Sequence, residues 1–323
     1  MKKPVSKPLN LKPEFTARME KLLAPADFDR YKKILNEPIL RSIRCNTLKI
    51  STQELKERLE SKGWKIKQPW PKHPEIMIVE NDLEPGELGR ALEHLLGYYY
   101  IQELASLLPA ISLNPQSNEF ILDLAAAPGS KTTQISSYIN NTGTIIANEI
   151  SFSRIKILAS NLERCGCSNT IITKKEGSAL CQRLKKQNYL FDKILLDAPC
   201  SGEGTLRSTP KTSLMWNPKT IKSVSRLQKT LITSALEILK SGGILVYSTC
   251  THAPEENEEV IDFALKKFSN IKLETINLPV KTREGITNWQ DQIYNSEVKK
   301  CARIYPQDNN TEGFFIAKLR KIK

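Results

Sequence analysis

The stretch Phe120-Ile-Leu-Asp-Leu-Ala-Ala-Ala-Pro-Gly-Ser-Lys-Thr-Thr-Gln decides the fold of this chain. It reads as a buried strand, a turn of small residues and the start of a helix. The turn, from Ala125 to Gly129, leaves its backbone uncovered, so a ligand can pack against it and meet the free N–H groups of the helix. Neither the pattern of phosphate-binding P-loops nor Gly-x-Gly-x-x-Gly is present. The pocket therefore need not bind phosphate, and such a turn can also serve packing alone.

Apolar strands alternate with helical segments from Gly97 onward. This alternation is typical of a parallel sheet with crossover helices. Between the fourth and fifth strands, apolar residues recur at helical spacing from Ile221 to Ile238. We therefore expect an α/β domain with a seven-stranded, mostly parallel sheet, whose strands are residues 120–124, 144–149, 170–173, 193–197, 244–248, 271–275 and 314–319.

The first 96 residues predict a smaller, mixed α+β domain. We expect a helical stretch to about Leu35, strands at residues 42–46 and 75–79, and an amphipathic helix at residues 51–62. The predicted domains are therefore residues 1–96 and residues 97–323.

The chain of 323 residues carries 48 Lys and Arg against 35 Asp and Glu, a net charge of +13. This excess favours a polyanionic partner, although an ordinary solvated surface explains it equally well. With 40% hydrophobic residues the chain can bury a core, which excludes wholesale disorder. Its apolar runs are far shorter than the roughly 20 residues of a membrane span, and the N-terminus lacks the apolar region of a secretory signal. We expect a cytoplasmic protein that contacts no membrane.

An acidic residue follows each of three neighbouring predicted strands: Glu149, Glu176 and Asp197. Ligands of open parallel sheets bind beyond the carboxyl ends of the strands, and an acid about 20 residues after the loop is placed to bind ribose hydroxyls. The next acid is placed to receive an adenine amino group. Each acid alone is also typical of a loop or a helix cap, but three in register favour an adenosyl ligand.

Two cysteines, Cys200 and Cys250, follow the fourth and fifth predicted strands within Asp197-Ala-Pro-Cys-Ser-Gly-Glu-Gly-Thr and Tyr247-Ser-Thr-Cys-Thr. Their strand-end positions predict adjacent loops and favour catalysis. The seven cysteines are an odd, irregularly spaced set, which indicates reduced thiols rather than a disulfide framework. Paired zinc-ligand spacing is lacking, so we expect no metal. The remaining five are interpreted as small buried hydrophobes: Cys45, Cys165, Cys167, Cys181 and Cys301.

Both cysteine motifs and the turn motif, in this order, resemble the hallmark motifs of the Nol/Nop/Sun (RsmB/NOP) family of RNA cytosine-5 methyltransferases. The resemblance extends to Arg44-Cys-Asn-Thr-Leu-Lys, to Tyr98-Tyr-Tyr-Ile-Gln and to Glu312-Gly-Phe-Phe, and so covers most of the chain. It implies a Rossmann-like class I methyltransferase domain, S-adenosylmethionine as cofactor, and a small N-terminal RNA-binding domain.

The resemblance also implies roles for individual residues. Cys250 would be the nucleophile that attacks carbon 6 of cytosine, Asp197 would contact N3 of the ring, and Cys200 would assist release of the product. The cofactor's methionine end would lie on the turn, its ribose on Glu149, and its adenine on Glu176 and Gly177. Arg154 matches a basic position near the ribose acid, although it also fits an ordinary surface arginine. The turn residues concerned are Ala125, Ala126, Ala127, Pro128, Gly129, Ser130 and Lys131.

Two departures from the family pattern concern fine positioning. The turn reads Ala-Ala-Ala-Pro-Gly-Ser where relatives commonly have Cys-Ala-Ala-Pro-Gly-Gly or -Gly-Lys, and Glu176 stands where Asp is usual. Lys131 also fits a helix-start lysine that points to solvent. The acidic run Glu255, Glu256, Glu258 and Glu259 is interpreted as the first turn of a helix, complementing its dipole, and is left out of the active site.

The leading hypothesis is an RNA cytosine-5 methyltransferase, with tRNA favoured because the chain is compact and lacks a long accessory extension. Ribosomal RNA is the close alternative. An idle RNA-binding assembly factor is a second class, against which the retention of both Cys200 and Cys250 argues. An amino-group methyltransferase would need an Asn- or Asp-Pro-Pro-Tyr/Phe loop where Asp197-Ala-Pro-Cys stands.

Overall fold

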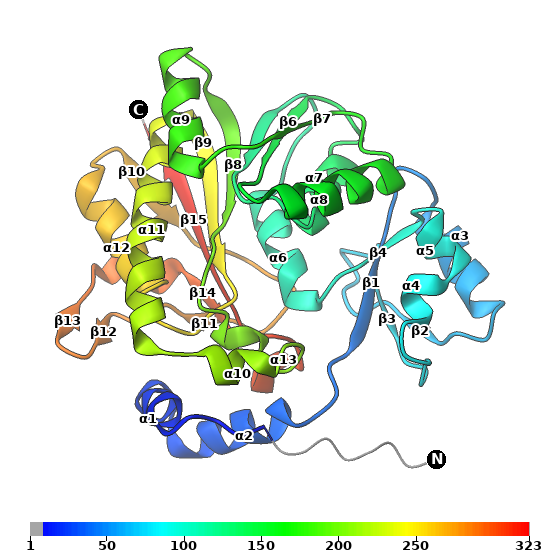
Figure 1. The fold of residues 1–323 in the computed structure, drawn as a ribbon, viewed down its shortest axis with the longest axis horizontal. Coiled ribbons are helices and arrows are strands. Elements are labelled where there is room, and N and C mark those ends of the chain that lie inside the picture. The colour runs from blue at the N-terminus through cyan, green and yellow to red at the C-terminus, as the bar shows by residue number, and fades with distance from the viewer. Residues whose placement is uncertain (1–8, 323) are drawn as a thin grey trace.

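A large nine-stranded sheet and a small four-stranded sheet organise residues 9–322, which are the residues that the computed structural model describes (Figure 1). The N-terminal residues on which the expectation of no secretory signal rests lie outside this range. None of the helices in residues 9–322 is long and apolar enough to cross a bilayer.

Five parallel strands form the centre of the large sheet, in the order β9-β8-β5-β6-β7. Successive residues of β5 lie on opposite faces of the sheet: Ile121 packs into one apolar cluster and Leu122 into another. Burial on both faces explains why these strands read as continuous apolar runs. Their bounds are β5 (Phe120–Asp123), β6 (Thr144–Asn148), β7 (Thr170–Thr173), β8 (Phe191–Asp197) and β9 (Leu239–Thr249).

Four antiparallel strands extend the sheet beyond β9. All seven predicted strands are present, so the predicted α/β fold class is confirmed. The expected number of seven strands was wrong, because the large sheet within residues 9–322 has nine. The two additional strands, β11 and β14, are too short to give a sequence pattern. The four are β10 (Ile271–Glu274), β11 (Arg283–Glu284), β14 (Ala302–Ile304) and β15 (Phe314–Lys321).

Helices cover both faces of the large sheet (Figure 1). On one face, Leu180, Leu231 and Val260 of three helices belong to the same apolar cluster as Leu122. The helices of that face are α9 (Gly177–Lys186), α11 (Pro218–Glu237) and α12 (Glu258–Lys267). On the other face lie α6 (Leu104–Leu113) and α7 (Ser130–Tyr138), while α8 (Phe152–Cys165) packs on the turn that follows β5.

The small sheet is antiparallel, in the order β2-β3-β1-β4. Its last strand, β4, pairs with β1, so the sheet extends to Ile101 rather than ending before residue 97. The elements are β1 (Arg41–Cys45), α3 (Thr52–Glu60), β2 (Ile66–Lys67), β3 (Ile76–Val79), α4 (Glu87–Arg90), α5 (Leu92–Leu95) and β4 (Tyr99–Ile101).

The first two helices, α1 (Pro13–Leu22) and α2 (Pro25–Leu35), pack on the large domain rather than on the small sheet. Phe15 makes an edge contact with Trp216, and Tyr31 with His252. The division into residues 1–96 and 97–323 therefore stays a proposal. In its revised form the boundary lies after β4, and α1 and α2 belong with the large domain. The shorter elements are η1 (Glu203–Thr205), α10 (Lys211–Met215), β12 (Asn288–Trp289), β13 (Gln292–Ile293), η2 (Ser296–Lys300) and α13 (Pro306–Asn309).

Candidate active site

The turn after β5 is held open by contacts to its carbonyl groups. Asn161 of α8 donates to the carbonyl of Pro128 at 2.8 Å, and Arg154 donates to that of Ala127. Gly129 has φ of +103°, and a Cβ there would lie 3.0 Å from Leu158, so a side chain would strain both backbone and packing. With its carbonyls engaged toward α8, the turn keeps its small residues free to meet a ligand.

Beside the turn lies a hollow of about 110 Å³ whose chemistry fits an adenosyl group. Two exposed apolar side chains, Ile150 (61% exposed) and Leu227 (40% exposed), line it together with the carboxylate of Glu149. Apolar walls suit a flat base, and a carboxylate suits ribose hydroxyls. The hollow is lined by Leu124, Ala125, Asn148, Glu149, Ile150, Arg154, Lys175, Glu176, Gly177, Pro199, Leu227 and Leu231.

Five predicted cofactor residues meet in this hollow: Ala125, Glu149, Arg154, Glu176 and Gly177. Glu149 is buried and forms an ion pair with Arg154 at 3.1 Å, so this arginine is tied to the site while its side chain stays half-exposed. A Cβ on Gly177 would lie 2.6 Å from Cδ2 of Leu231, so a side chain there would displace that leucine. Glu176 caps α9 by accepting hydrogen bonds from Ser178 and Ala179. Burial raises the pKa of Glu176, but the hydrogen bonds from Ser178 outweigh this and lower it. The adenine role of Glu176 stays a prediction, since its carboxylate already serves the helix.

The two predicted active-site thiols lie at the same edge of the sheet. Cys200 follows β8 and Cys250 follows β9, and their Sγ atoms are 3.1 Å apart as free cysteines. The two loops are joined by backbone bonds from Ala198 to Ser248 and from Gly204 to Cys250, both 2.8 Å. The hydrogen bond with Cys250, together with burial, raises the pKa of Cys200 well above its ordinary value. The raised pKa favours the thiol form of Cys200, which faces Cys250.

Asp197, at the end of β8, is bound from two sides. Its Oδ1 accepts from Ser248 at 2.7 Å, and its Oδ2 lies 2.6 Å from Nζ of Lys131. Lys131 is only 7% exposed and also donates to Ser106 at 3.0 Å. The solvent-facing interpretation of Lys131 is wrong, because its ammonium group turns inward to the carboxylate. The first turn of α7 and the end of β8 thus present a charge pair next to the thiols.

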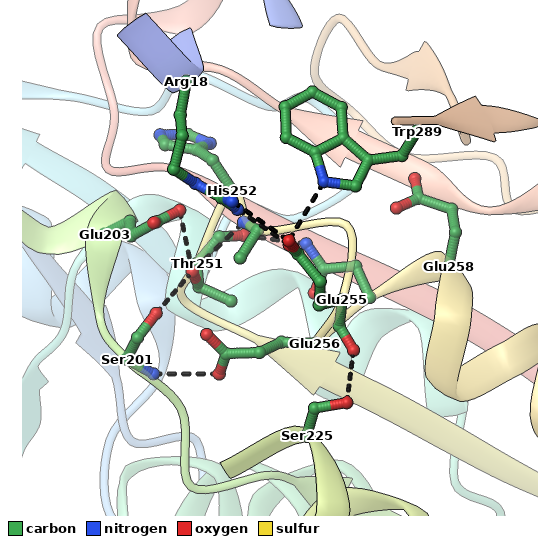
Figure 2. Close-up of polar contacts among 12 residues, drawn as sticks. Arg18, Ser201, Glu203, Ser225, Thr251, His252, Glu255, Glu256, Glu258 and Trp289 are labelled. Atoms are coloured by element: carbon green, nitrogen blue, oxygen red, sulfur yellow. Dashed lines mark hydrogen bonds and ion pairs between the residues drawn. The ribbon is translucent and has the colours of Figure 1, made fainter. Parts of the chain in front are cut away.

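The acidic run after Cys250 lies only partly in the first turn of a helix. Because α12 begins at Glu258, Glu258 and Glu259 are in its first turn, as expected. Glu255 and Glu256 precede that helix (Figure 2). Glu255 forms a bidentate ion pair with Arg18 of α1, at 2.7 and 3.0 Å. Glu256 accepts the N–H of Ser201, next to Cys200. Glu258 is buried against Arg303. The first-turn interpretation is therefore wrong for Glu255 and Glu256, which make tertiary contacts around the thiol loops. The dense placement of acids directly after Cys250 was the available signal.

The sequence indicates Arg44 only as part of a motif that resembles the family, and its structural role was not predicted. It lies on β1, is fully buried, and donates to the carbonyl of Ser130 and to Thr133 Oγ1, both at 2.8 Å. It thereby joins the small sheet to the start of α7. Nothing in its local sequence indicates burial of a charge.

The described residues 9–322 contain no group of three His, Cys, Asp or Glu arranged to hold a metal ion. The expectation of a metal-free enzyme stays a prediction.

The family model described as 16S rRNA methyltransferase RsmB/F matches residues 110–320. The chain belongs to this family. The model for the N-terminal domain of 16S rRNA methyltransferase RsmF matches residues 11–104. The resemblance to the RsmB/NOP family of RNA cytosine-5 methyltransferases is confirmed, and with it the S-adenosylmethionine-dependent methyltransferase fold and cofactor.

Similar proteins come from archaea and bacteria. A tRNA (cytosine(49)-C(5))-methyltransferase of Pyrococcus abyssi is 44% identical, over 91% of this chain and 92% of its own length. The ribosomal RNA small subunit methyltransferase F of Pectobacterium carotovorum is 38% identical over 97% of this chain, which spans 63% of that protein.

Solved structures agree with this assignment. A methyltransferase homolog from Pyrococcus horikoshii superimposes with a TM-score of 0.84 at 36% identity, covering 97% of this chain and 96% of its own. NSun6 from the same organism, solved with SFG, has a TM-score of 0.80 at 28% identity, covering 97% of this chain and 98% of its own. This RsmB/F-family chain is thus an RNA methyltransferase that uses S-adenosylmethionine.

Proposed function

We propose that this chain methylates carbon 5 of a cytosine in tRNA through a covalent adduct between Cys250 and carbon 6. The observation that carries the proposal is the 3.1 Å approach of the Cys200 and Cys250 sulfurs beside the Lys131–Asp197 pair. Two thiols, a carboxylate and an ammonium group at one sheet edge form a set suited to addition to and elimination from a pyrimidine ring.

The covalent route answers an electronic problem, since carbon 5 of cytosine is a poor nucleophile. Addition of the Cys250 thiolate to carbon 6 makes the ring enamine-like and carbon 5 nucleophilic. The Asp197 carboxyl group would donate a proton to N3 as electron density gathers there, and the Lys131 ammonium group, 2.6 Å from that carboxyl group, would replace the proton. S-adenosylmethionine supplies the methyl group. Loss of the carbon 5 proton then restores the double bond, and the bond between carbon 6 and Cys250 breaks.

The cofactor assignment within this mechanism follows the hollow beside β5. Glu149 would bind the ribose and Gly177, with Glu176, the adenine edge, while the turn from Ala125 to Lys131 would hold the methionine end. The ion pair of Glu149 with Arg154 supports the ribose role, because it fixes the carboxylate in a buried position. The target base must be single-stranded or extruded from a duplex, at a cost of a few kcal/mol.

The choice of tRNA is supported by the Pyrococcus abyssi relative, which is 44% identical over 92% of its length. Ribosomal RNA is the alternative, since the small subunit methyltransferase F proteins are similar over most of this chain. A cytoplasmic location stays the prediction made from the sequence.

Substrate class is tested with purified protein, unmodified total tRNA and unmodified rRNA. Bisulfite sequencing is expected to reveal a new 5-methylcytosine in tRNA that depends on S-adenosylmethionine. New sites in rRNA alone would favour the alternative substrate, and no new site in either would favour an idle RNA-binding factor.

RNA affinity is expected to fall steeply with added salt, because a basic protein releases counterions from phosphates, whereas cofactor affinity changes much less.

Cys200→Ala is expected to accumulate a covalent complex with RNA, because attack by Cys250 remains possible while release is impaired. The complex is seen as a band of low mobility that survives denaturation and contains both protein and labelled RNA. The matched control is Cys167→Ala, which removes another partly buried thiol outside the site. Wild-type turnover without accumulation in Cys200→Ala would contradict the assigned role of Cys200.

A further inference from the structure

A buried carboxyl group lies behind the Cys200 loop and takes no part in the mechanism described above. Glu256 follows Cys250 by six residues and is 0% exposed. Its Oε2 accepts the backbone N–H of Ser201 at 2.9 Å and Nε2 of Gln228 at 3.0 Å. Its Oε1 is buried without a hydrogen-bond partner among the described residues. A buried acid with a free oxygen is costly to the fold, which indicates a function beyond packing.

The contacts of Glu256 hold the Cys200 loop on both sides of the thiol. Gln228 donates to the carbonyl of Pro199 at 2.8 Å and to Glu256, while Glu256 holds the N–H of Ser201. A third contact joins Ser201 Oγ to Thr251 Oγ1 at 2.9 Å (Figure 2). Gln228 of α11 thus holds the backbone immediately before Cys200, and the segment after Cys250 holds the backbone immediately after it.

We propose that Glu256 is a positioning residue for Cys200, which fixes the thiol against Cys250 and keeps it in its protonated, hydrogen-bond-donating form. The inference rests on the proposed covalent route and gives Cys200 a defined task in it. During release, the carbon 5 proton passes to water and its electron pair forms the double bond between carbons 5 and 6. The bond between carbon 6 and sulfur breaks, and its pair returns to Cys250 as a thiolate. The Cys200 S–H, 3.1 Å away, stabilises that thiolate by donating to it.

Electrostatics favour this assignment. Burial raises the pKa of Glu256 to about 7, so its negative charge appears in the range where a thiol would begin to ionise. The hydrogen bond with Cys250 and burial are the largest causes of the raised pKa of Cys200, and the negative charge of Glu256 adds to them. The other titratable or charged groups that act on or are affected by Cys200 and Glu256 are Cys250, Glu203, Tyr247 and Arg18.

The test is the pH dependence of Cys200 alkylation in the free protein, measured with iodoacetamide and site-resolved mass spectrometry. Glu256→Gln retains an acceptor for Ser201 but removes the charge. It is expected to move the pH midpoint of Cys200 alkylation down by about one unit, which is about a tenfold faster rate near pH 8.5. Glu256→Asp should restore a midpoint near that of the wild type. The matched control, Glu259→Gln, changes a half-buried acid paired with Lys229 and should have no effect.

An unchanged Cys200 profile in folded Glu256→Gln would overturn the proposal. Protection of the buried Cys45 and Cys181 reports folding in the same spectra. If Cys45 and Cys181 react in Glu256→Gln, that variant is not folded and Gln228→Leu is used in its place. Loss of the Gln228 hydrogen bond favours the neutral form of the Glu256 carboxyl group, so Cys200 should react faster at pH 8 than in the wild type. No acceleration would refute the inference.

A second readout is the decay of the RNA adduct as a function of pH. As the pH is raised, release should begin to slow at a lower pH in Glu256→Gln than in the wild type, because Cys200 loses its proton at a lower pH. The rate of adduct formation should be retained. A purely structural role would lower both rates without moving the pH profile, and that result would refute the proposal. A shifted alkylation profile without an RNA adduct in any variant would refute the covalent route and leave the link between Glu256 and Cys200 standing.

Discussion

Cys250→Ala is expected to lower methyl transfer to RNA by at least about a thousandfold, because removal of a covalent nucleophile eliminates the route that makes carbon 5 reactive. Cofactor affinity should be unchanged, since Cys250 does not line the hollow beside β5. Methyl incorporation from labelled S-adenosylmethionine measures the first effect, and equilibrium dialysis of the cofactor measures the second.

RNA containing 5-fluorocytidine sharpens this experiment. A carbon 5 that carries fluorine has no proton to lose, so the wild-type protein should remain bound to it covalently, and Cys250→Ala should form no such complex. Cys167→Ala serves as the control for loss of a thiol elsewhere and should behave as the wild type. Residual methylation within tenfold of the wild type in Cys250→Ala would show that the nucleophile has been assigned wrongly.

The parallel core of the fold could be predicted because its strands are buried on both faces and therefore appear as apolar runs. The meeting of Cys200 and Cys250 followed from the same fact, since parallel neighbours such as β8 and β9 end at one edge. Short strands such as β11 escaped prediction because two residues carry no periodicity. Propensity alone determines little at that length, and pairing with β14 decides the structure.

The missed parts of the site depend on partners that are distant in the sequence. Arg18 and Glu255 are separated by 237 positions, and Arg44 reaches Ser130 across 86. Glu255 and Glu256 were expected in the first turn of a helix together with Glu258 and Glu259, because local composition is the same for an acid that complements a helix dipole and for one with a remote partner. Only the packing of α1 and of the Cys200 loop on this segment distinguishes them.

Glu258→Leu is expected to destabilise the protein by about 3 to 5 kcal/mol, the range for breaking one side of a buried ion pair. Both oxygens of Glu258 accept from Arg303 at 2.6 Å, and both side chains are buried. Without its partner the guanidinium stays uncompensated in the core. Urea unfolding measures the free energy, and Glu237→Leu is the control: its ion pair with Lys185 is largely exposed and should contribute no more than about 1 kcal/mol.

The double variant Glu258→Leu/Arg303→Met separates the ion pair from its surroundings. If the unpaired charge causes the loss, the double variant should be more stable than Glu258→Leu alone, because no buried charge remains. Arg303 also donates to the carbonyl of His252 at 3.0 Å, two residues after Cys250. The double variant should therefore recover stability without recovering full methyl transfer. Full recovery of both would mean that this pair stabilises the sheet without supporting the Cys250 loop, and a single variant that loses less than about 1 kcal/mol would contradict the buried-charge argument itself.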